Sequence, residues 1–216
     1  MNDTHLKAKK PTAAKSLPAF GLQITELQVL RGMSLVINGL SHHQQAGDIY
    51  CLTGPNGAGK STLLRTIANR LPIADGNIFC PVPIIYVGHN DGLSGSISGR
   101  ENLKGWAKIN GFPYPSAAID KALASFDATG FANINVRLLS RGQRRRLALT
   151  RLALAPANSL WLLDEPNASL DQLSNATLDA VVIAHATLGG MVLAATHLDF
   201  TANASPKFIA LPGRQE

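Results

Sequence analysis

The sequence predicts an α/β fold with a largely parallel central sheet, and three observations support this. Short apolar runs of strand length recur along the 216 residues. The segments between most of these runs carry apolar residues at helical spacing. A glycine-rich loop lies directly after one apolar run and before one helical segment. Strands that alternate with helices are typical of parallel sheets, because each helix carries the chain back to the start of the next strand.

Five apolar runs are the predicted strands of the parallel sheet. They cover residues 49–52, 84–87, 160–163, 191–195 and 208–211. Runs of this length without polar alternation suit strands that are buried on both faces of a sheet.

Four helices are predicted among the segments between these strands. One follows the glycine loop, where apolar residues recur at helical spacing. Another begins after Ser98, because Ser98 and Glu101 have the spacing of a capping box. A third covers residues 116–126, and a fourth begins near Ser140. The segment 89–154 is therefore predicted to be a helical insertion into the core that contains the parallel sheet.

One domain is expected over residues 22–213, with a core of residues 22–88 and 155–213 around the helical insertion 89–154. A chain of 216 residues with 45% hydrophobic residues can bury one such core. Residues 1–21 are predicted to be a flexible basic tail, since four lysines and one aspartate supply +3 of the net charge of +6. Two interpretations of this tail remain, attraction to acidic lipid head groups and a solvated extension, and the second is the simpler.

Several classes of protein are excluded by composition. No apolar run is long enough and free enough of charge to cross a membrane. The N-terminus lacks the apolar segment of a signal peptide, so a cytoplasmic location is expected. Cys51 and Cys80 have no C-x-x-C spacing, which argues against a disulfide framework or a zinc site.

The glycine loop has the spacing G-x-x-x-x-G-K-S. Its glycines let the backbone turn tightly, so that N–H groups surround a phosphate chain. Lys60 places an ammonium against the terminal phosphates, and the Ser61 hydroxyl is a ligand for Mg²⁺. The helix that follows adds free N–H groups and its dipole. The loop therefore predicts a nucleoside triphosphate site made by Gly54, Pro55, Asn56, Gly57, Ala58, Gly59, Lys60, Ser61 and Thr62.

The apolar run at residues 160–163 ends in two carboxylates, Asp164 and Glu165. In open α/β sheets, ligands bind beyond the carboxyl ends of the strands. We expect Asp164 to hold Mg²⁺, usually through water, and Glu165 to polarise the attacking water as a general base. The alternative is an ordinary strand end whose acids cap the next turn. The glycine loop in the same chain favours the metal and base roles.

A third motif, L-S-R-G-Q at residues 139–143, precedes the two carboxylates. With the glycine loop and the Asp-Glu strand in this order, the chain resembles the ATP-binding subunits of ABC transporters, whose signature is L-S-G-G-Q. The resemblance implies a P-loop NTPase with a RecA-like parallel-sheet core, an antiparallel β portion at the N-terminus and a helical signature subdomain. It also implies that Ser140, Gly142 and Gln143 contact ATP held by a second copy of the chain.

Two further matches extend the resemblance, and one departure narrows it. Residues 168–171 match the loop that contacts the second subunit, and His197 matches a histidine that hydrogen-bonds the γ-phosphate. Residues 86–93 form Y-V-G-H-N-D-G-L where most members carry a glutamine. This pattern is similar to the haem-exporter, cytochrome c maturation branch of ABC ATPases. Either His89 or Asn90 then takes the place of the glutamine at the ATP site.

The resemblance implies an ATP hydrolase of the translocase class that uses Mg²⁺ and works as a homodimer with integral membrane subunits. The expected place is the cytoplasmic face of the inner membrane, and haem is involved only indirectly. One alternative is the ATPase of another ABC exporter. The other is a soluble ABC protein of ribosomes or DNA, which usually has two ATPase halves or a long coiled-coil insertion, and neither fits in 216 residues.

The consecutive arginines and the adenine site each bear on this family pattern. The arginines at residues 144–146 suit a basic, amphipathic signature helix better than a nucleic-acid surface, so no nucleic-acid partner is expected. Members of the family usually stack adenine on an aromatic residue upstream of the glycine loop, but residues 23–38 contain none. The planar guanidinium of Arg31 is a candidate to stack on the base instead.

Overall fold

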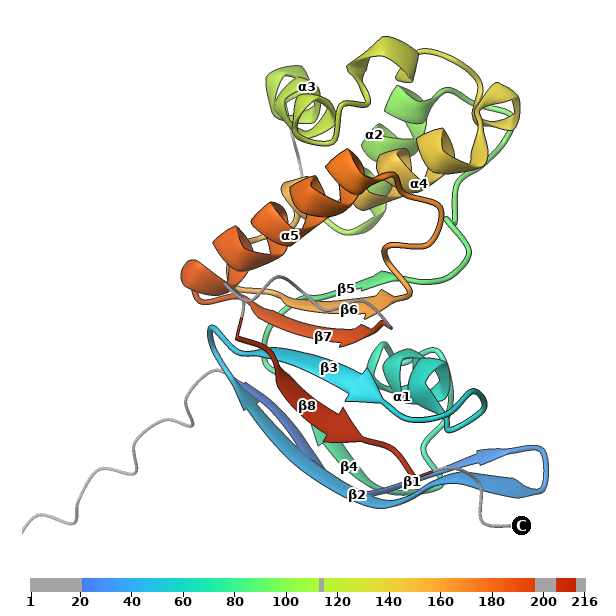
Figure 1. The fold of residues 1–216 in the computed structure, drawn as a ribbon, viewed down its shortest axis with the longest axis vertical. Coiled ribbons are helices and arrows are strands. Elements are labelled where there is room, and N and C mark those ends of the chain that lie inside the picture. The colour runs from blue at the N-terminus through green and yellow to red at the C-terminus, as the bar shows by residue number, and fades with distance from the viewer. Residues whose placement is uncertain (1–20, 113–114, 197–204, 213–216) are drawn as a thin grey trace, which may run out of the picture.

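The predicted parallel sheet is present in the computed structural model, which describes residues 21–112, 115–196 and 205–212 (Figure 1). Its strand order is β5-β6-β7-β3-β8, and every hydrogen-bonded pair is parallel. The strands are β3 Ile49–Thr53, β5 Ile84–Val87, β6 Leu160–Asp164, β7 Met191–Ala195 and β8 Lys207–Ala210. All five predicted strands are confirmed, and their ends differ by one residue at most.

A second, antiparallel sheet covers one face of the core, as the family resemblance implies. It has the order β2-β1-β4 and consists of β1 Gly21–Arg31, β2 Ser34–Gln45 and β4 Asp75–Phe79. Helix α1 (Lys60–Ile67) lies between the two sheets (Figure 1). Leu63 and Leu64 of this helix are fully buried against apolar side chains of both sheets. The phosphate loop is thus anchored by a helix that is packed on two sides.

The other face of the parallel sheet is covered by α5 (Gln172–Thr187), a helix that the sequence patterns above do not predict. Leu178 and Val182 lie one helical turn apart and pack against Trp161 and other side chains of the sheet. Asp171 caps the helix by accepting a hydrogen bond from the Ser174 N–H at 2.8 Å.

The helical insertion forms the end of the molecule above α5 in Figure 1. It contains α2 Gly99–Ile109, α3 Ser116–Ser125, α4 Arg141–Leu149 and short 3₁₀ turns at Thr129–Phe131, Val136–Leu138 and Leu152–Leu154. The predicted capping box of Ser98 and Glu101 is confirmed, and Ser140 begins α4 with a second one. The insertion has an apolar cluster of its own, which includes Leu103, Leu123 and Leu147. The exact limits of this subdomain and of the basic tail stay predictions.

Two features are absent from the parts of the chain that the structure describes. No helix there is long and apolar enough to cross a membrane. No group of three or more histidine, cysteine or acidic side chains gathers there as a metal cage. Cys51 is buried in β3 and Cys80 is partly buried, and neither forms a disulfide.

Candidate active site

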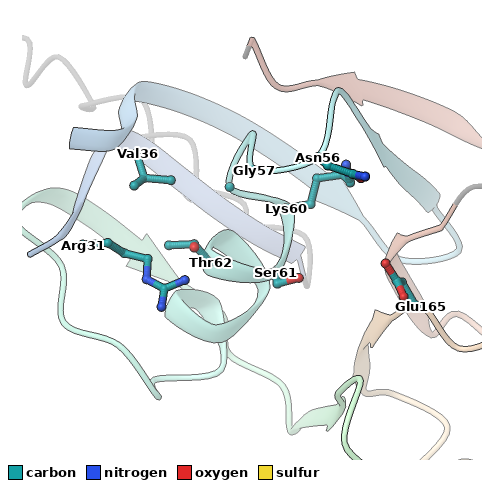
Figure 2. Close-up of a pocket in the computed structure, with 9 residues that line it drawn as sticks. Arg31, Val36, Asn56, Gly57, Lys60, Ser61, Thr62 and Glu165 are labelled. Atoms are coloured by element: carbon teal, nitrogen blue, oxygen red, sulfur yellow. The ribbon is translucent and has the colours of Figure 1, made fainter. Parts of the chain in front are cut away.

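A cavity of about 250 Å³ lies at the carboxyl edge of the parallel sheet, beside the start of α1 (Figure 2). Its walls come from the phosphate loop, from α1, from the β1–β2 hairpin and from the end of β6. The lining residues are Arg31, Val36, Asn56, Gly57, Gly59, Lys60, Ser61, Thr62 and Glu165. The structure therefore brings the predicted phosphate loop and the predicted general base into one cavity.

The phosphate loop has the backbone that an anion site needs. Gly59 is the N-cap of α1 with φ 98°, and a Cβ at this position would lie 2.7 Å from Val36 Cγ1. The Lys60 ammonium donates to the carbonyl oxygens of Gly54 at 2.7 Å and Pro55 at 3.0 Å. The cation therefore lies over the loop, next to the free N–H groups of the first turn of α1.

The two predicted metal ligands meet at the foot of the cavity. The Ser61 hydroxyl donates to Asp164 Oδ1 at 2.8 Å, and Asp164 is only 1% exposed. The Tyr86 hydroxyl donates to the other oxygen, Oδ2, at 3.3 Å, and burial raises the pKa of Tyr86, which keeps this donor protonated. One hydroxyl and one carboxylate are the hard oxygen set with which proteins hold Mg²⁺ beside a phosphate chain. These residues fit the ion.

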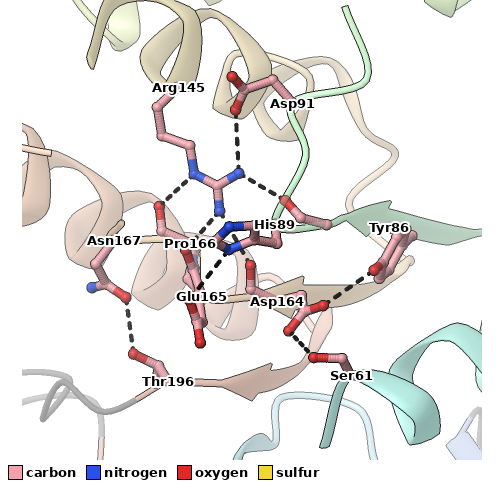
Figure 3. A network of polar contacts seen from close by, with 11 residues as sticks. Ser61, Tyr86, His89, Asp91, Arg145, Asp164, Glu165, Pro166, Asn167 and Thr196 are labelled. Atoms are coloured by element: carbon pink, nitrogen blue, oxygen red, sulfur yellow. Dashed lines mark hydrogen bonds and ion pairs between the residues drawn. The ribbon is translucent and has the colours of Figure 1, made fainter. Parts of the chain in front are cut away.

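Glu165 differs from the neighbouring Asp164 in the exposure of its side chain and in its backbone conformation. Its side chain is 47% exposed, and its backbone has φ 49°, in the left-handed region. Its N–H donates to the Ala195 carbonyl at 2.8 Å, which fixes the turn at the end of β6. His89 Nδ1 lies 3.3 Å from Glu165 Oε2 (Figure 3). Of the two candidates to replace the family's glutamine, it is His89 that contacts the predicted general base.

The signature residues lie at the start of α4 and do not line the described cavity. Ser140 Oγ accepts from the Gln143 N–H at 3.2 Å, and Gln143 Oε1 accepts from the Ser140 N–H at 2.9 Å. The Ser140 hydroxyl proton stays available for an outside acceptor. A Cβ on Gly142 would lie 3.1 Å from the Ser169 carbonyl, so this glycine allows α4 and the loop 168–171 to approach closely.

Arg145 is a site residue that the sequence patterns missed. It is 2% exposed and donates to carbonyl oxygens on both sides of Glu165 as well as to Gly88 (Figure 3). Burial lowers the pKa of its guanidinium from a very high starting value. A signal was present in the sequence, because Arg145 lies at helical spacing from the apolar residues Ala148 and Leu149. Of the three consecutive arginines, this one is therefore directed toward the core.

Three further placements complete the site. Thr196 Oγ1 donates to Asn167 Oδ1 at 2.9 Å and ties β7 to the turn after Glu165. His197, the predicted γ-phosphate contact, lies outside the described residues. Arg31 and Val36 line the cavity at the hairpin, and none of the described residues that line it is aromatic. That the guanidinium of Arg31 stacks on the base stays a prediction.

Comparison with known sequences identifies relatives. The sequence model of the ABC transporter family matches residues 37–168. The chain is 42% identical to the cytochrome c biogenesis ATP-binding export protein CcmA of Paracoccus denitrificans, over 82% of this chain and 83% of that protein. It is 41% identical to the CcmA of Rhodobacter capsulatus, over 82% of this chain and 81% of that protein.

Comparison with solved structures supports the fold. A putative ABC transporter ATP-binding protein from Pyrococcus furiosus superposes with a TM-score of 0.75 at 23% identity, over 88% of this chain and 97% of that one. An ATP-binding cassette of an ABC transporter in its ADP conformation gives a TM-score of 0.71 at 20% identity, over 88% and 87%. These likenesses show the fold, and the sequence matches show that the chain belongs to the ABC transporter family of ATP-binding proteins.

Proposed function

We propose that this chain is the ATP-hydrolysing subunit of an ABC complex for cytochrome c maturation and haem export. The observation that carries this proposal is that Lys60, Ser61 and Glu165 line one and the same cavity, with Asp164 directly behind it. The relatives at about 40% identity are cytochrome c biogenesis ATP-binding export proteins, and their names support the cytochrome c maturation role proposed for this chain.

The lining residues divide the reaction between binding and hydrolysis. Lys60 and the loop N–H groups bind the phosphate chain. Ser61 and Asp164 would hold Mg²⁺, which would supply neutralisation of the charge on the phosphates. Glu165 accepts a proton from the attacking water. The water oxygen forms a bond to the γ-phosphorus, and the bond between the γ-phosphorus and the oxygen that leaves with ADP breaks. His89 supports the carboxylate that accepts this proton.

The complete site is proposed to need two copies of the chain. Ser140, Gly142 and Gln143 begin α4 outside the cavity that their own Lys60 lines, so they are placed to contact ATP in a partner copy. His197 is proposed to contact the γ-phosphate from the end of β7. ATP would then lie between two subunits, and hydrolysis would reopen the dimer.

Mixing two inactive variants tests the dimer. A heterodimer of Lys60→Ala and Ser140→Ala chains has one site with both lesions and one site with neither. With random pairing, half of the dimers are mixed, so about a quarter of the wild-type hydrolysis rate should return. ATPase assays on equimolar mixtures measure this. If the ATPase rate of the mixture equals the mean of the rates of the two separate variants, the site is self-contained in one monomer.

The coupling partners are proposed to be integral membrane subunits, with the chain bound peripherally at the cytoplasmic face of the inner membrane. Haem enters only through those subunits, since the roles proposed above place nucleotide and Mg²⁺ in the cavity. A nucleic-acid partner is not part of this proposal, because Arg145 and Arg146, two of the three consecutive arginines of α4, make their polar contacts within the subunit.

Genetic complementation tests the biological role. Deletion of the gene should abolish c-type cytochromes with covalently attached haem and leave b-type cytochromes in place. The wild-type chain should restore them, and the Glu165→Gln chain should not. Unchanged c-type cytochromes in the deletion strain would point to an exporter of another substrate. Co-purification with ribosomes or DNA instead of membrane proteins would point to a non-transport ABC ATPase.

A further inference from the structure

The guanidinium of Arg145 holds the backbone on both sides of the general base. It donates to three successive carbonyl oxygens, at 3.3 Å to Asp164, 2.7 Å to Glu165 and 3.0 Å to Pro166. A guanidinium presents its donors in a rigid plane. Acceptors bound to it therefore keep fixed positions relative to one another. The peptide planes that flank Glu165 are thus held, and with them the left-handed φ of 49° that aims its side chain.

The same guanidinium also holds the loop that carries His89. Its Nη1 donates to the Gly88 carbonyl at 2.8 Å and lies 3.4 Å from Asp91 Oδ1. His89 lies between these two anchors, and its ring is 3.3 Å from the Glu165 carboxylate. Both members of the His89–Glu165 pair are therefore attached to one side chain of α4 (Figure 3).

A second arginine strengthens the link between this loop and the helical insertion. Arg151 follows α4 and donates to the carbonyls of Asp91 at 3.0 Å and Gly92 at 2.7 Å. Burial lowers the pKa of Arg151 to about 10, so it stays charged at neutral pH. The position of the loop 88–92 therefore depends on the positions of α4 and of the turn after α4.

A simple packing role does not account for a charge at this position. Burying a charged side chain costs several kcal/mol, and well-packed apolar residues usually stabilise a core as well or better. The contacts of Arg145 go to two chain segments that carry predicted site residues, and not to neighbouring helices of the insertion. The position therefore serves the geometry of those segments.

We propose that Arg145 is a positioning residue for the hydrolysis step, which sets Glu165 and His89 relative to the nucleotide and makes both follow α4. This inference rests on the proposed function. Ser140 caps the same helix that carries Arg145. A displacement of α4 caused by nucleotide at Ser140 is therefore transmitted to the general base of the same subunit.

Substitutions at Arg145 test the proposal in the full chain. A displacement of about 1 Å at a catalytic group can cost about 10²-fold in rate. We expect Arg145→Lys and Arg145→Gln to lower kcat by about 10- to 100-fold and to change the Kd for Mg·ATP by less than about threefold. Arg146→Gln is the matched control, because Arg146 pairs with the exposed Asp127 inside the insertion. It should keep kcat within about twofold.

A double-mutant cycle separates positioning from general damage. If Arg145 acts through Glu165, Arg145→Lys should cost less than about threefold when added to Glu165→Gln, measured by single-turnover hydrolysis. The same large loss in both backgrounds would overturn the proposal. Asp91→Asn replaces the Arg145 variants in the cycle if thermal denaturation shows that those variants are unfolded at the assay temperature. It removes only the carboxylate partner and should lower kcat by about two- to fivefold, again only when Glu165 is present.

The wild-type chain in this cycle also tests the proposed function separately. Hydrolysis that does not depend on Glu165 would overturn the proposed function and the positioning role with it. Hydrolysis that depends on Glu165, combined with additive losses in the cycle, would overturn the positioning role alone.

Discussion

The two sides of the cavity are held in place by different means. On the phosphate-loop side, Lys60 and Ser61 sit on a helix packed between two sheets, and Asp164 is almost fully buried. On the α4 side, Glu165 and His89 are about half exposed, and their backbones are held by arginines that reach across from the helical insertion. One side is built from the core, and the other depends on where α4 lies.

This difference suggests a division of labour. A binding site gains from rigidity, because ATP must be held in every cycle with the same contacts. A hydrolytic group that depends on a movable helix can be brought into position only when that helix has its nucleotide contact. Asp164 and Glu165 are adjacent residues of one strand end, but different groups hold their side chains. The Ser61 and Tyr86 hydroxyls hold the Asp164 carboxylate, and His89 contacts the Glu165 carboxylate. The predictions below test that separation.

The largest effect is expected when each side is disabled in turn. Lys60→Ala should lose ATP binding itself, because it removes the cation that lies over the loop. Glu165→Gln keeps the shape of the side chain and removes the base, so binding should persist and hydrolysis should fall by about 10²- to 10⁴-fold. Fluorescent nucleotide titration and phosphate release measure the two quantities. Equal loss of binding in both variants would contradict the division between the two sides.

The same division decides what could be predicted from the sequence. The phosphate loop, the five parallel strands and the Ser98 capping box depend on residues close in the chain, so their spacing alone predicts them. The Asp164 carboxylate could also be placed at the sheet edge beforehand, because it directly follows an apolar run.

The contacts of the α4 side escaped prediction for a physical reason. Arg145 joins Gly88, far upstream, to the strand end at Glu165, and such pairings arise only when the whole fold is assembled. Tyr86 contacts Asp164 across two neighbouring strands and was not singled out for the same reason. Helix α5 was missed because its surface carries a weak apolar pattern, with few charges to mark the exposed side.

A second prediction concerns the far end of β6, away from both sides of the cavity. His185 stacks on Trp161 with ring centroids 3.7 Å apart, and its Nε2 donates to the Ser159 carbonyl at 3.0 Å. Burial lowers the pKa of His185 to about 4, below the value of about 6.5 in an unfolded chain. The unfolded state therefore binds the proton more readily, and the stabilisation from the neutral ring is lost as pH falls below about 6.5.

Urea unfolding at several pH values measures this effect. Between pH 7 and pH 5, the free energy of unfolding should fall by about 2 kcal/mol through His185 alone. The His185→Gln chain supplies the comparison, because its stability should lack this component. The phosphate-loop and α4 sides should bind ATP normally in both proteins at pH 7. Identical pH slopes for the two proteins would contradict the assignment to His185.

The smallest effect is expected at His89, whose Nδ1 lies 3.3 Å from the Glu165 carboxylate. Both side chains are about half exposed, so water screens their attraction and replaces it in part when the ring is removed. His89→Ala should therefore lower kcat by only about two- to tenfold and leave the Kd for ATP nearly unchanged. His89→Gln should preserve the ATPase activity, because its amide can donate to the same carboxylate oxygen.

The larger consequence of His89→Ala should be in coupling to the proposed membrane partners. His89 lies between Gly88 and Asp91, both held by Arg145, so it follows the position of α4 more closely than any group on the phosphate loop. Stimulation of the ATPase by the membrane partners should therefore weaken in His89→Ala and persist in His89→Gln. Comparing the isolated chain with the assembled complex measures this. Unaltered stimulation in His89→Ala, with full cytochrome c assembly, would move the coupling role to Asn90 or out of loop 88–92, because the Glu165 contact would then serve hydrolysis only.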